Sequence, residues 1–201
     1  MAEDIPAKLV KELRDITGAK MMDCKRALVE ANGDVSKAQE VLRKKGQADA
    51  KKRSGKSVKQ GVINSYIHGN RIGVMAEMNC ETDFVARNED FRETLKDICM
   101  HIAASNPTYI SRDQVPADII EKEKEVYRAQ IKNKPENVVE KIVEGKLVNF
   151  FKDICLLEQP FVKNDKFTVG EIITQLNAKI GENIVFSRFM RWELGVGLDE
   201  E

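Results

Sequence analysis

The chain has 201 residues, of which 42% are hydrophobic and 33% are charged, and this composition excludes a disordered or fibrous protein. Its 33 basic residues balance 33 acidic residues, so the chain lacks the net positive charge with which non-specific nucleic-acid binders attract phosphates. We therefore expect a globular protein that makes no direct contact with nucleic acid.

No uninterrupted apolar run approaches the roughly 20 residues that a membrane-spanning helix needs, and the acidic start at Glu3 and Asp4 is unlike a signal peptide. We expect a cytoplasmic protein with no membrane partner. The four cysteines form no CxxC pair and no other compact spacing of metal ligands, which predicts reduced thiols and indicates no metal or cofactor. They are Cys24, Cys80, Cys99 and Cys155.

The charges divide the chain into three ranges. Residues 1–46 carry a net charge of +2, residues 47–60 carry +4, and residues 61–201 carry −6. The middle range has a single strongly apolar residue, Val58, so burial contributes little to offset the entropy cost of ordering it. We interpret it as a basic linker between two units. A phosphate-binding patch is the alternative, although no aromatic residue interleaves the charges to stack on bases.

The first range, 1–46, has the apolar spacing of three short helices. The first helix should end at Thr17-Gly18, and the second should run from about Met22 to Asn32-Gly33. The third should begin after the cap Asp34 and end at Gly46. A core of this size leaves little room for a catalytic cavity, so the pattern favours a docking module.

The second range, 61–201, mixes strands and helices. Apolar residues alternate on both sides of Gly69-Asn70, which predicts a β-hairpin, and Asn88 can cap the helix that follows. Helices that begin at Pro116 and Pro135 are separated by the short break 132–135, so an antiparallel helical hairpin is expected over 116–154. That hairpin could project as an arm or fold flat on the sheet.

The end of this range supplies a final helix and strand. Thr168 and Glu171 fit a capping box, Gly181 should end the helix, and residues 184–192 alternate like a strand that closes the sheet. The predicted fold class is therefore α+β, with a three-helix module followed by an antiparallel sheet packed with helices.

Residues typical of a catalytic site are scarce. The chain has two histidines, His68 and His101, and no phosphate-binding glycine motif or metalloprotease motif. The sequence therefore predicts that the protein is not an enzyme. A thiol or histidine hydrolase that uses Cys80 and His68 on the hairpin is kept as a minor hypothesis.

The segment after the hairpin, Glu81–Ala86, has two interpretations. Thr82 could cap a helical turn while Phe84 and Val85 pack into the core. Alternatively, an exposed Phe84 could fill a pocket of a partner, with Asp83 accepting hydrogen bonds or repelling an anion.

A second candidate surface is formed by Arg14, Met21 and Met22, at the end of the first helix and the turn after it. Methionine suits an adaptable contact surface, but both methionines could equally complete the small core. The sequence leaves these two interpretations open.

Several segments together resemble the bacterial translation elongation factor Ts family, essentially from end to end. The main ones are Leu9–Arg14, Thr17–Leu28, Glu30–Asp34 and Asn79–Ala86. Five more follow in the family's order, and the combination is far more specific than any single motif. They are Ser65–Val74, His101–Pro107, Val143–Lys146, Gln159–Val162 and Thr168–Gly170.

This resemblance implies a guanine-nucleotide exchange factor that binds elongation factor Tu carrying GDP and speeds release of the nucleotide. The family's N-terminal module, which is similar to ubiquitin-associated domains, docks on Tu through residues that match Arg14, Met21 and Met22. The family's intruding segment, which disturbs the Mg²⁺ site of Tu, matches Thr82, Asp83, Phe84 and Val85. The histidine that matches His68 lies near the contact surface.

The chain departs from longer family members, which carry two related core subdomains. Only about 20 residues separate Ser65 from Phe84, so both motifs fall in one unit here. Short members restore the pair as a homodimer, which implies a dimer through the sheet of 61–201 with two Tu molecules bound. The helical hairpin 116–154 is similar to the family's coiled-coil segment. The alternative function is an adaptor that binds a ubiquitin-like protein through residues 1–46.

Overall fold

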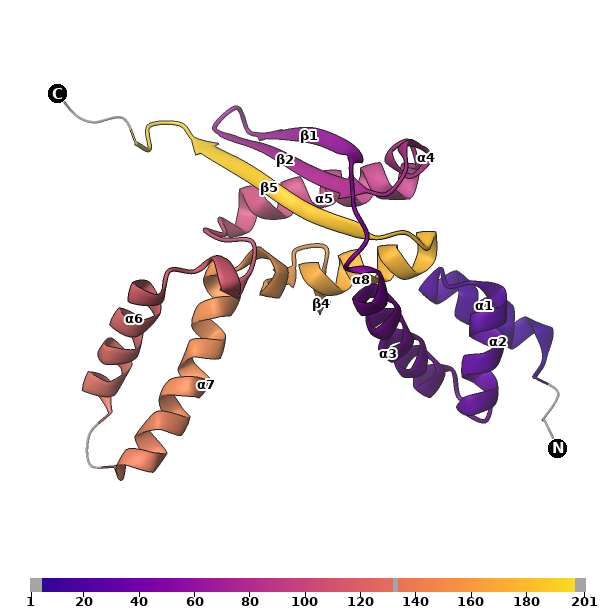
Figure 1. The fold of residues 1–201 in the computed structure, drawn as a ribbon, viewed down its shortest axis with the longest axis horizontal. Helices are drawn as coiled ribbons and strands as arrows, with labels where there is room; N and C mark the ends of the chain where they lie inside the picture. The colour runs from indigo at the N-terminus through magenta and orange to yellow at the C-terminus, as the bar shows by residue number, and fades with distance from the viewer. Residues whose placement is uncertain (1–4, 132–133, 198–201) are drawn as a thin grey trace. The chain divides into compact units, whose positions relative to one another are not determined.

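The computed structural model describes residues 5–131 and 134–197, and its fold class is the predicted α+β (Figure 1). Three strands form an antiparallel sheet in the order β1-β2-β5, and a small second sheet pairs β3 with β4. The strands are β1 (Gln60–His68), β2 (Ile72–Cys80), β3 (Pro160–Phe161), β4 (Asn164–Thr168) and β5 (Ile184–Glu193). The α-helices are α1 (Ala7–Thr17), α2 (Met21–Glu30), α3 (Val35–Arg53), α4 (Asp83–Ala86), α5 (Glu89–Ser105), α6 (Ala117–Gln130), α7 (Glu136–Ile154) and α8 (Val169–Ile180).

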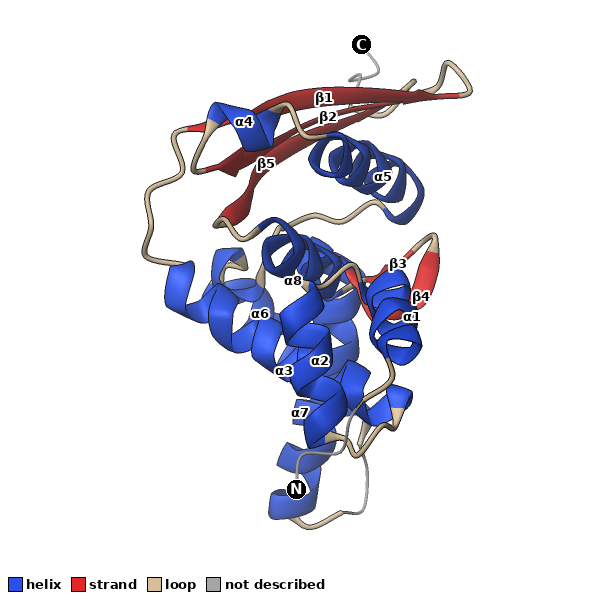
Figure 2. Ribbon diagram, turned by 90° about the vertical axis from the view of Figure 1, so that its right-hand side faces the viewer, coloured by secondary structure: helices blue, strands red, loops and turns tan. Residues whose placement is uncertain are grey.

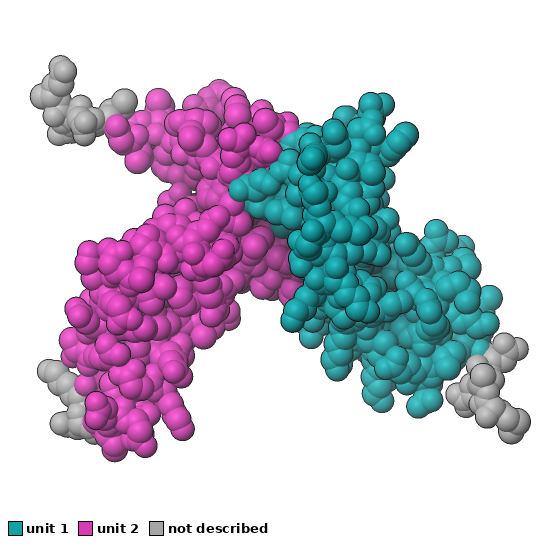
Figure 3. Space-filling model, viewed as in Figure 1, with its two compact units in different colours: residues 1–62, 78–94, 172–187 teal, residues 63–77, 95–171, 188–201 magenta. Residues whose placement is uncertain are grey.

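The chain packs as two compact units (Figure 3). Unit 1 contains residues 1–62, 78–94 and 172–187, and unit 2 contains residues 63–77, 95–171 and 188–201. These units describe packing, whereas the expected ranges 1–46, 47–60 and 61–201 concern independent folding and stay a prediction.

Helices α1 to α3 form the predicted three-helix arrangement in unit 1, around a small apolar core. Gly18 ends α1 with φ +65°, and its N–H donates to the carbonyl of Arg14 at 2.7 Å. The Asp34 carboxylate caps α3 by accepting from the N–H of Lys37 at 3.0 Å. The core residues are Ile5, Val10, Leu13, Cys24, Ala27, Leu28, Ala31 and Ala38.

The predicted end of α3 at Gly46 is wrong, because the helix continues to Arg53. Gly46 is buried, and a Cβ placed there would lie 3.4 Å from the Cβ of Ala178 in α8. Three basic residues, Lys51, Lys52 and Arg53, occupy the last turn, where they stabilise the negative end of the helix dipole. The glycine therefore permits a close helix contact, and residues 47–53 of the expected linker are helical.

The short-range signals of the second range are confirmed. Gly69 and Asn70 adopt positive φ values of +53° and +56°, as a tight hairpin turn between β1 and β2 requires. Thr168 and Glu171 form the capping box at the start of α8, with backbone-to-side-chain bonds of 3.0 and 3.2 Å. Gly181 ends α8 with φ +92°.

Unit 2 contains the predicted helical hairpin, in which α6 begins after Pro116 and α7 begins after Pro135. Part of the predicted break, residues 132–133, lies outside the described residues. The two helices share a hydrophobic cluster centred on Val115, Val143, Leu147, Phe151 and Cys155. Strands β3 and β4 were not predicted, because β3 has only two residues. Over residues 5–131 and 134–197, no helix is long and apolar enough to cross a membrane.

Candidate functional site

The ring of Phe84 is exposed to solvent. Its exposed fraction is 79%, the largest among the large apolar side chains of the described residues. Burial of a phenylalanine side chain stabilises a folded protein by about 1.5–3 kcal/mol. The fold does not gain this stabilisation at Phe84. The interpretation that Phe84 packs into the core is therefore wrong, whereas Val85 is buried as that interpretation expected.

The segment that carries Phe84 is a short helical turn, α4, with a defined start. The Thr82 hydroxyl accepts a hydrogen bond from the N–H of Val85 at 3.4 Å, as expected for its cap. Val85 and Ala86 are buried, while the Asp83 carboxylate accepts from the Arg87 guanidinium at 2.9 Å. The backbone of the turn is thus anchored while the aromatic ring faces water.

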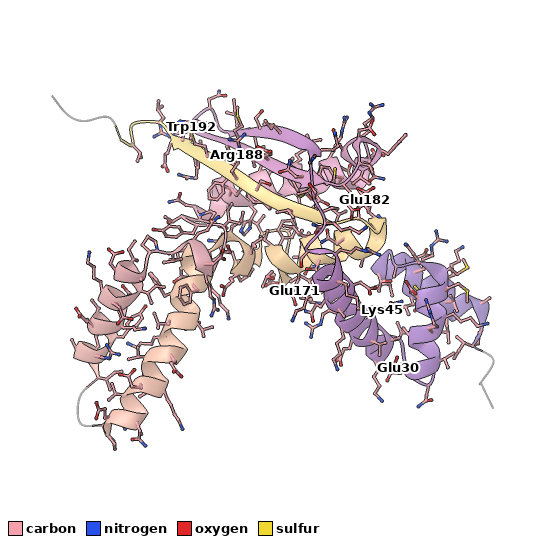
Figure 4. All side chains as sticks on the ribbon, in the orientation of Figure 1. Glu30, Lys45, Glu171, Glu182, Arg188 and Trp192 are labelled. Carbon is pink, nitrogen blue, oxygen red and sulfur yellow. The ribbon has the colours of Figure 1, made fainter. Side chains whose placement is uncertain are left out.

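The turn between α8 and β5 supplies contacts to this segment that the sequence did not reveal. The Glu182 carboxylate accepts hydrogen bonds from the backbone N–H groups of Glu81 and Thr82, at 3.1 and 3.0 Å. Glu182 is labelled in Figure 4 between α8 and β5. It lies 100 positions from Thr82, so no local pattern could have indicated the contact.

The second candidate surface is also exposed. Met21 and Met22 expose 52% and 63% of their surface, and the Arg14 side chain is exposed on α1. The alternative in which both methionines complete the small core is therefore wrong. Ile16 is exposed as well, so this face of the N-terminal helices presents apolar surface to water.

His68 lies at the end of β1, in unit 2, where its Nδ1 and the Tyr66 hydroxyl share a hydrogen bond of 3.0 Å. Thr82 to Val85 belong to unit 1 together with Arg14 and the two methionines. The structure therefore groups seven of the eight candidate residues in one unit and assigns His68 to the other.

The environment of Cys80 is unfavourable for nucleophilic catalysis. Its thiol is buried and donates to the carbonyl of Thr82 at 3.1 Å. Burial, reinforced by the Glu182 carboxylate, raises the pKa of the Cys80 thiol to about 11. Because the thiolate is the reactive form, this cysteine is a poor nucleophile at neutral pH.

His101 has a structural environment. It is fully buried, its Nε2 and the side-chain oxygen of Gln159 are 2.9 Å apart, and its Nδ1 accepts from the N–H of Val162 at 3.2 Å. Burial lowers the pKa of His101, so the ring is neutral near pH 7 and links helix α5 to the β3 region.

Comparison with known proteins defines the family. The sequence profile of the family described as "Elongation factor TS" matches residues 2–196. The chain is 56% identical to elongation factor Ts of Thermodesulfovibrio yellowstonii over 197 residues, which cover 98% of this chain and 99% of that protein. The chain belongs to the elongation factor Ts family. Its role is therefore that of a translation elongation factor.

Two further members of the elongation factor Ts family give the same result. The protein of Carboxydothermus hydrogenoformans is 58% identical over 197 residues, covering 96% of this chain and 91% of its own length. The protein of Thermotoga maritima is 55% identical over 198 residues, covering 98% of this chain and 100% of its own. The similarity therefore extends over both candidate surfaces and the sheet.

This member of the elongation factor Ts family also exposes apolar side chains on its sheet. Residues 95–105 of helix α5 belong to unit 2. The helix lies along one face of the strands (Figure 2), and alternate residues of the three strands point away from it. We call this opposite side the outer face of the sheet. Its exposed apolar residues are Ile63 and Ile67 of β1, Met75 of β2, and Met190 and Trp192 of β5.

The outer face has a polar margin beside this apolar surface. Arg188 donates to the Glu77 carboxylate at 2.6 Å across β5 and β2, and Figure 4 labels Arg188 and Trp192 on the same strand. Because these apolar side chains are exposed, the helical hairpin 116–154 does not cover them. The alternative in which the hairpin folds flat on the sheet is therefore wrong for the outer face.

Proposed function

We propose that this protein is a guanine-nucleotide exchange factor for elongation factor Tu, which binds Tu carrying GDP and promotes GDP release so that GTP can bind. The observation that carries the proposal is the exposed ring of Phe84 on an anchored turn. An aromatic side chain presented by a fixed backbone loses little entropy when it enters a pocket of a partner. Membership of the elongation factor Ts family supports this action in translation.

The exchange would work through shared binding free energy. A GTPase holds GDP with backbone donors, a lysine and a bridging Mg²⁺. A factor that displaces the elements around the Mg²⁺ therefore lowers the affinity for GDP without touching the nucleotide. We assign that displacement to the segment Thr82–Val85, with Phe84 as the anchor. The effect is reciprocal, because GDP must weaken binding of the factor by the same ratio. A coupling free energy of about 4 kcal/mol corresponds to roughly a thousandfold change in each affinity.

The N-terminal helices would supply affinity for the nucleotide-binding domain of Tu. Met21 and Met22 offer exposed, flexible apolar surface, and the exposed Arg14 adds a charged group on the neighbouring helix. His68 would make a further contact from the β1–β2 hairpin. Binding free energy gained at these positions can be used to open the nucleotide site.

We further propose that the outer face of the sheet pairs with the same face of a second copy. Exposed apolar residues on three neighbouring strands form one apolar surface, and a two-fold axis would pack this surface of one copy against the same surface of the other. Such a dimer would carry two Tu molecules. For this role we propose a cytoplasmic location.

The two alternative functions receive less support. Nucleotide exchange requires binding and no covalent step, which agrees with a buried Cys80 whose pKa is raised to about 11. An adaptor for a ubiquitin-like protein would use the Met21 and Met22 surface, but it gives no role to Phe84. Similarity to elongation factor Ts over residues 2–196 favours the exchange factor over both.

Release of a fluorescent GDP analogue from elongation factor Tu tests the proposal. Tu loaded with the analogue is mixed with excess unlabelled GDP and increasing concentrations of this protein. We expect the release rate to rise with concentration and to saturate. A rate that equals spontaneous release at every concentration would refute the proposed function.

A further inference from the structure

The backbone that presents Phe84 is held by a residue far away in the sequence. Two backbone N–H groups, those of Glu81 and Thr82, point to one oxygen of the Glu182 carboxylate at 3.1 and 3.0 Å. The other oxygen accepts from the Thr82 hydroxyl at 2.7 Å. One side chain therefore satisfies three donors in the two residues that precede α4.

The hydroxyl of Thr82 extends this contact into the turn itself. Because the hydroxyl donates its proton to Glu182, its lone pairs remain available for the N–H of Val85, at 3.4 Å. The carboxylate thus fixes the orientation of the capping group as well as the backbone before it. Phe84 lies between Thr82 and Val85, so these bonds fix the backbone from which its ring projects.

A second set of contacts ties the same two turns together. The Glu81 carboxylate accepts from the N–H of Asn183 at 2.7 Å and forms an ion pair with Lys56 at 2.9 Å. The Asn183 amide donates to the carbonyl of Lys56 at 3.0 Å. The N–H of Asn183, followed by Lys56, lowers the pKa of Glu81, so this contact persists at neutral pH.

We propose that Glu182 is a positioning residue that holds the Phe84 segment in the conformation that acts on the partner GTPase. This proposal rests on the proposed function, since it concerns how the ring of Phe84 is aimed. Glu182 accepts from three donors, so its removal would leave two N–H groups and a hydroxyl without their partner and release the turn. Buried Val85 and Ala86 would keep the segment attached to the fold.

The first experiment measures maximal GDP release from Tu at a saturating concentration of each variant. We expect Glu182→Ala to lower the maximal rate about tenfold. The control is Glu93→Ala, which removes an exposed carboxylate of α5 in the same unit and should leave the rate unchanged. A folded Glu182→Ala variant with the wild-type rate would overturn the proposal.

Conservative variants separate positioning from charge. Glu182→Gln keeps the length of the side chain, and its amide can accept from both N–H groups and donate to the Thr82 hydroxyl, so we expect a rate within twofold of wild type. Glu182→Asp keeps the charge but is one methylene shorter, so we expect it to resemble Glu182→Ala. If Glu182→Asp kept the wild-type maximal rate and Glu182→Gln lost it, Glu182 would have an electrostatic role, and the proposal would be overturned.

A double variant tests whether Glu182 acts through Phe84. If it does, Phe84→Ala combined with Glu182→Ala should release GDP no more slowly than Phe84→Ala alone. A merely structural role for Glu182 would instead make the two losses multiply, and that result would contradict the proposal.

Hydrogen exchange of the free protein provides a readout that does not depend on Tu. We expect the amides of Glu81, Thr82 and Val85 to exchange at least tenfold faster in Glu182→Ala, while the amides of α5 keep their rates. The wild-type protein could fail to accelerate GDP release while these amides exchange faster in Glu182→Ala. In that case the proposed function fails, and the assignment of Glu182 to holding the turn stands. Unchanged amide exchange would remove that assignment.

Discussion

The α4 segment and the outer face of the sheet both expose apolar side chains, but they do so in different ways. At α4 a single ring, Phe84, stands on a turn that is held by backbone hydrogen bonds. On the outer face, apolar residues are spread over three strands, with Met190 and Trp192 on β5. A single exposed ring suits insertion into a pocket, whereas an apolar surface spread over several strands suits packing against a similarly extended surface.

This difference separates two kinds of association. A contact made by one anchor can form and break during each cycle of nucleotide exchange, because little surface has to be separated. A contact that covers several exposed apolar residues is typical of stable oligomers, whose interfaces resemble a protein core. We therefore expect the outer face to be occupied permanently and the Phe84 segment to be occupied transiently.

The largest expected effect is loss of the dimer. Trp192→Glu places a charge on the outer face, where pairing with a second copy would remove that charge from water without a partner of opposite sign. We expect light scattering after size-exclusion chromatography to show a dimer for wild type and a monomer for the variant.

The matched control for this prediction is Val126→Glu, which adds the same charge at an exposed apolar position of α6 in the same unit. This control should remain dimeric. A monomeric wild-type protein, or a dimeric Trp192→Glu variant, would show that the outer face does not pair with a second copy.

A smaller effect is expected at the N-terminal helices. Replacing both Met21 and Met22 with alanine removes exposed apolar surface worth about 1.4 kcal/mol on binding, which corresponds to roughly tenfold in affinity. We expect the concentration of factor needed for half-maximal GDP release to rise tenfold while the maximal rate is retained. The control Lys44→Ala, at an exposed position of α3, should change neither value.

A reduced maximal rate at saturation in the methionine variant would contradict the assignment of affinity to the N-terminal surface and of nucleotide release to the Phe84 segment. It would mean that the N-terminal surface takes part in opening the nucleotide site, in addition to the affinity that we assign to it.

The smallest effect is expected for the cysteines. Burial raises the pKa of Cys80, Cys99 and Cys155 to about 11 each, and it also raises the pKa of Cys24. At pH 8 a thiol with a pKa near 11 is ionised in about one molecule in a thousand, and the thiolate fraction grows tenfold with each pH unit up to that value. We expect almost no reaction with a thiol reagent in the native protein and reaction of all four thiols after unfolding.

Rapid labelling of Cys80 in the folded protein at pH 8 would contradict this prediction and would revive the thiol hydrolase hypothesis. Full exchange activity of a Cys80→Ser variant, which keeps the proposed contact residue His68, would remove the remaining support for that hypothesis.

The sequence was most informative where a structure depends on residues within one or two turns. The cap at Asp34, the hairpin turn at Gly69-Asn70 and the capping box of Thr168 were predicted for this reason. The predicted helix end at Gly46 is wrong because the role of this glycine is set by contact with Ala178, which is distant in the sequence.

Exposure and long-range contacts were harder to predict for the candidate site. The residues of both surfaces were singled out from the sequence and then matched to family motifs, but alternation and spacing could not decide whether Phe84 or Met21 faced water. The contact of Glu182 with Thr82 joins side chains 100 positions apart and has no local signature. Only folding brings such groups together, so the structure was needed to find them.

The most direct test of the account is the maximal rate of GDP release from elongation factor Tu with Phe84→Ala at saturating concentration. Because an anchor residue contributes about 2 kcal/mol or more, we expect a maximal rate at least about 30-fold below wild type, with the folded state unchanged. Thermal unfolding should confirm the fold, since Phe84 is exposed and its loss removes little packing. A folded Phe84→Ala variant that releases GDP at the wild-type maximal rate would contradict the central claim.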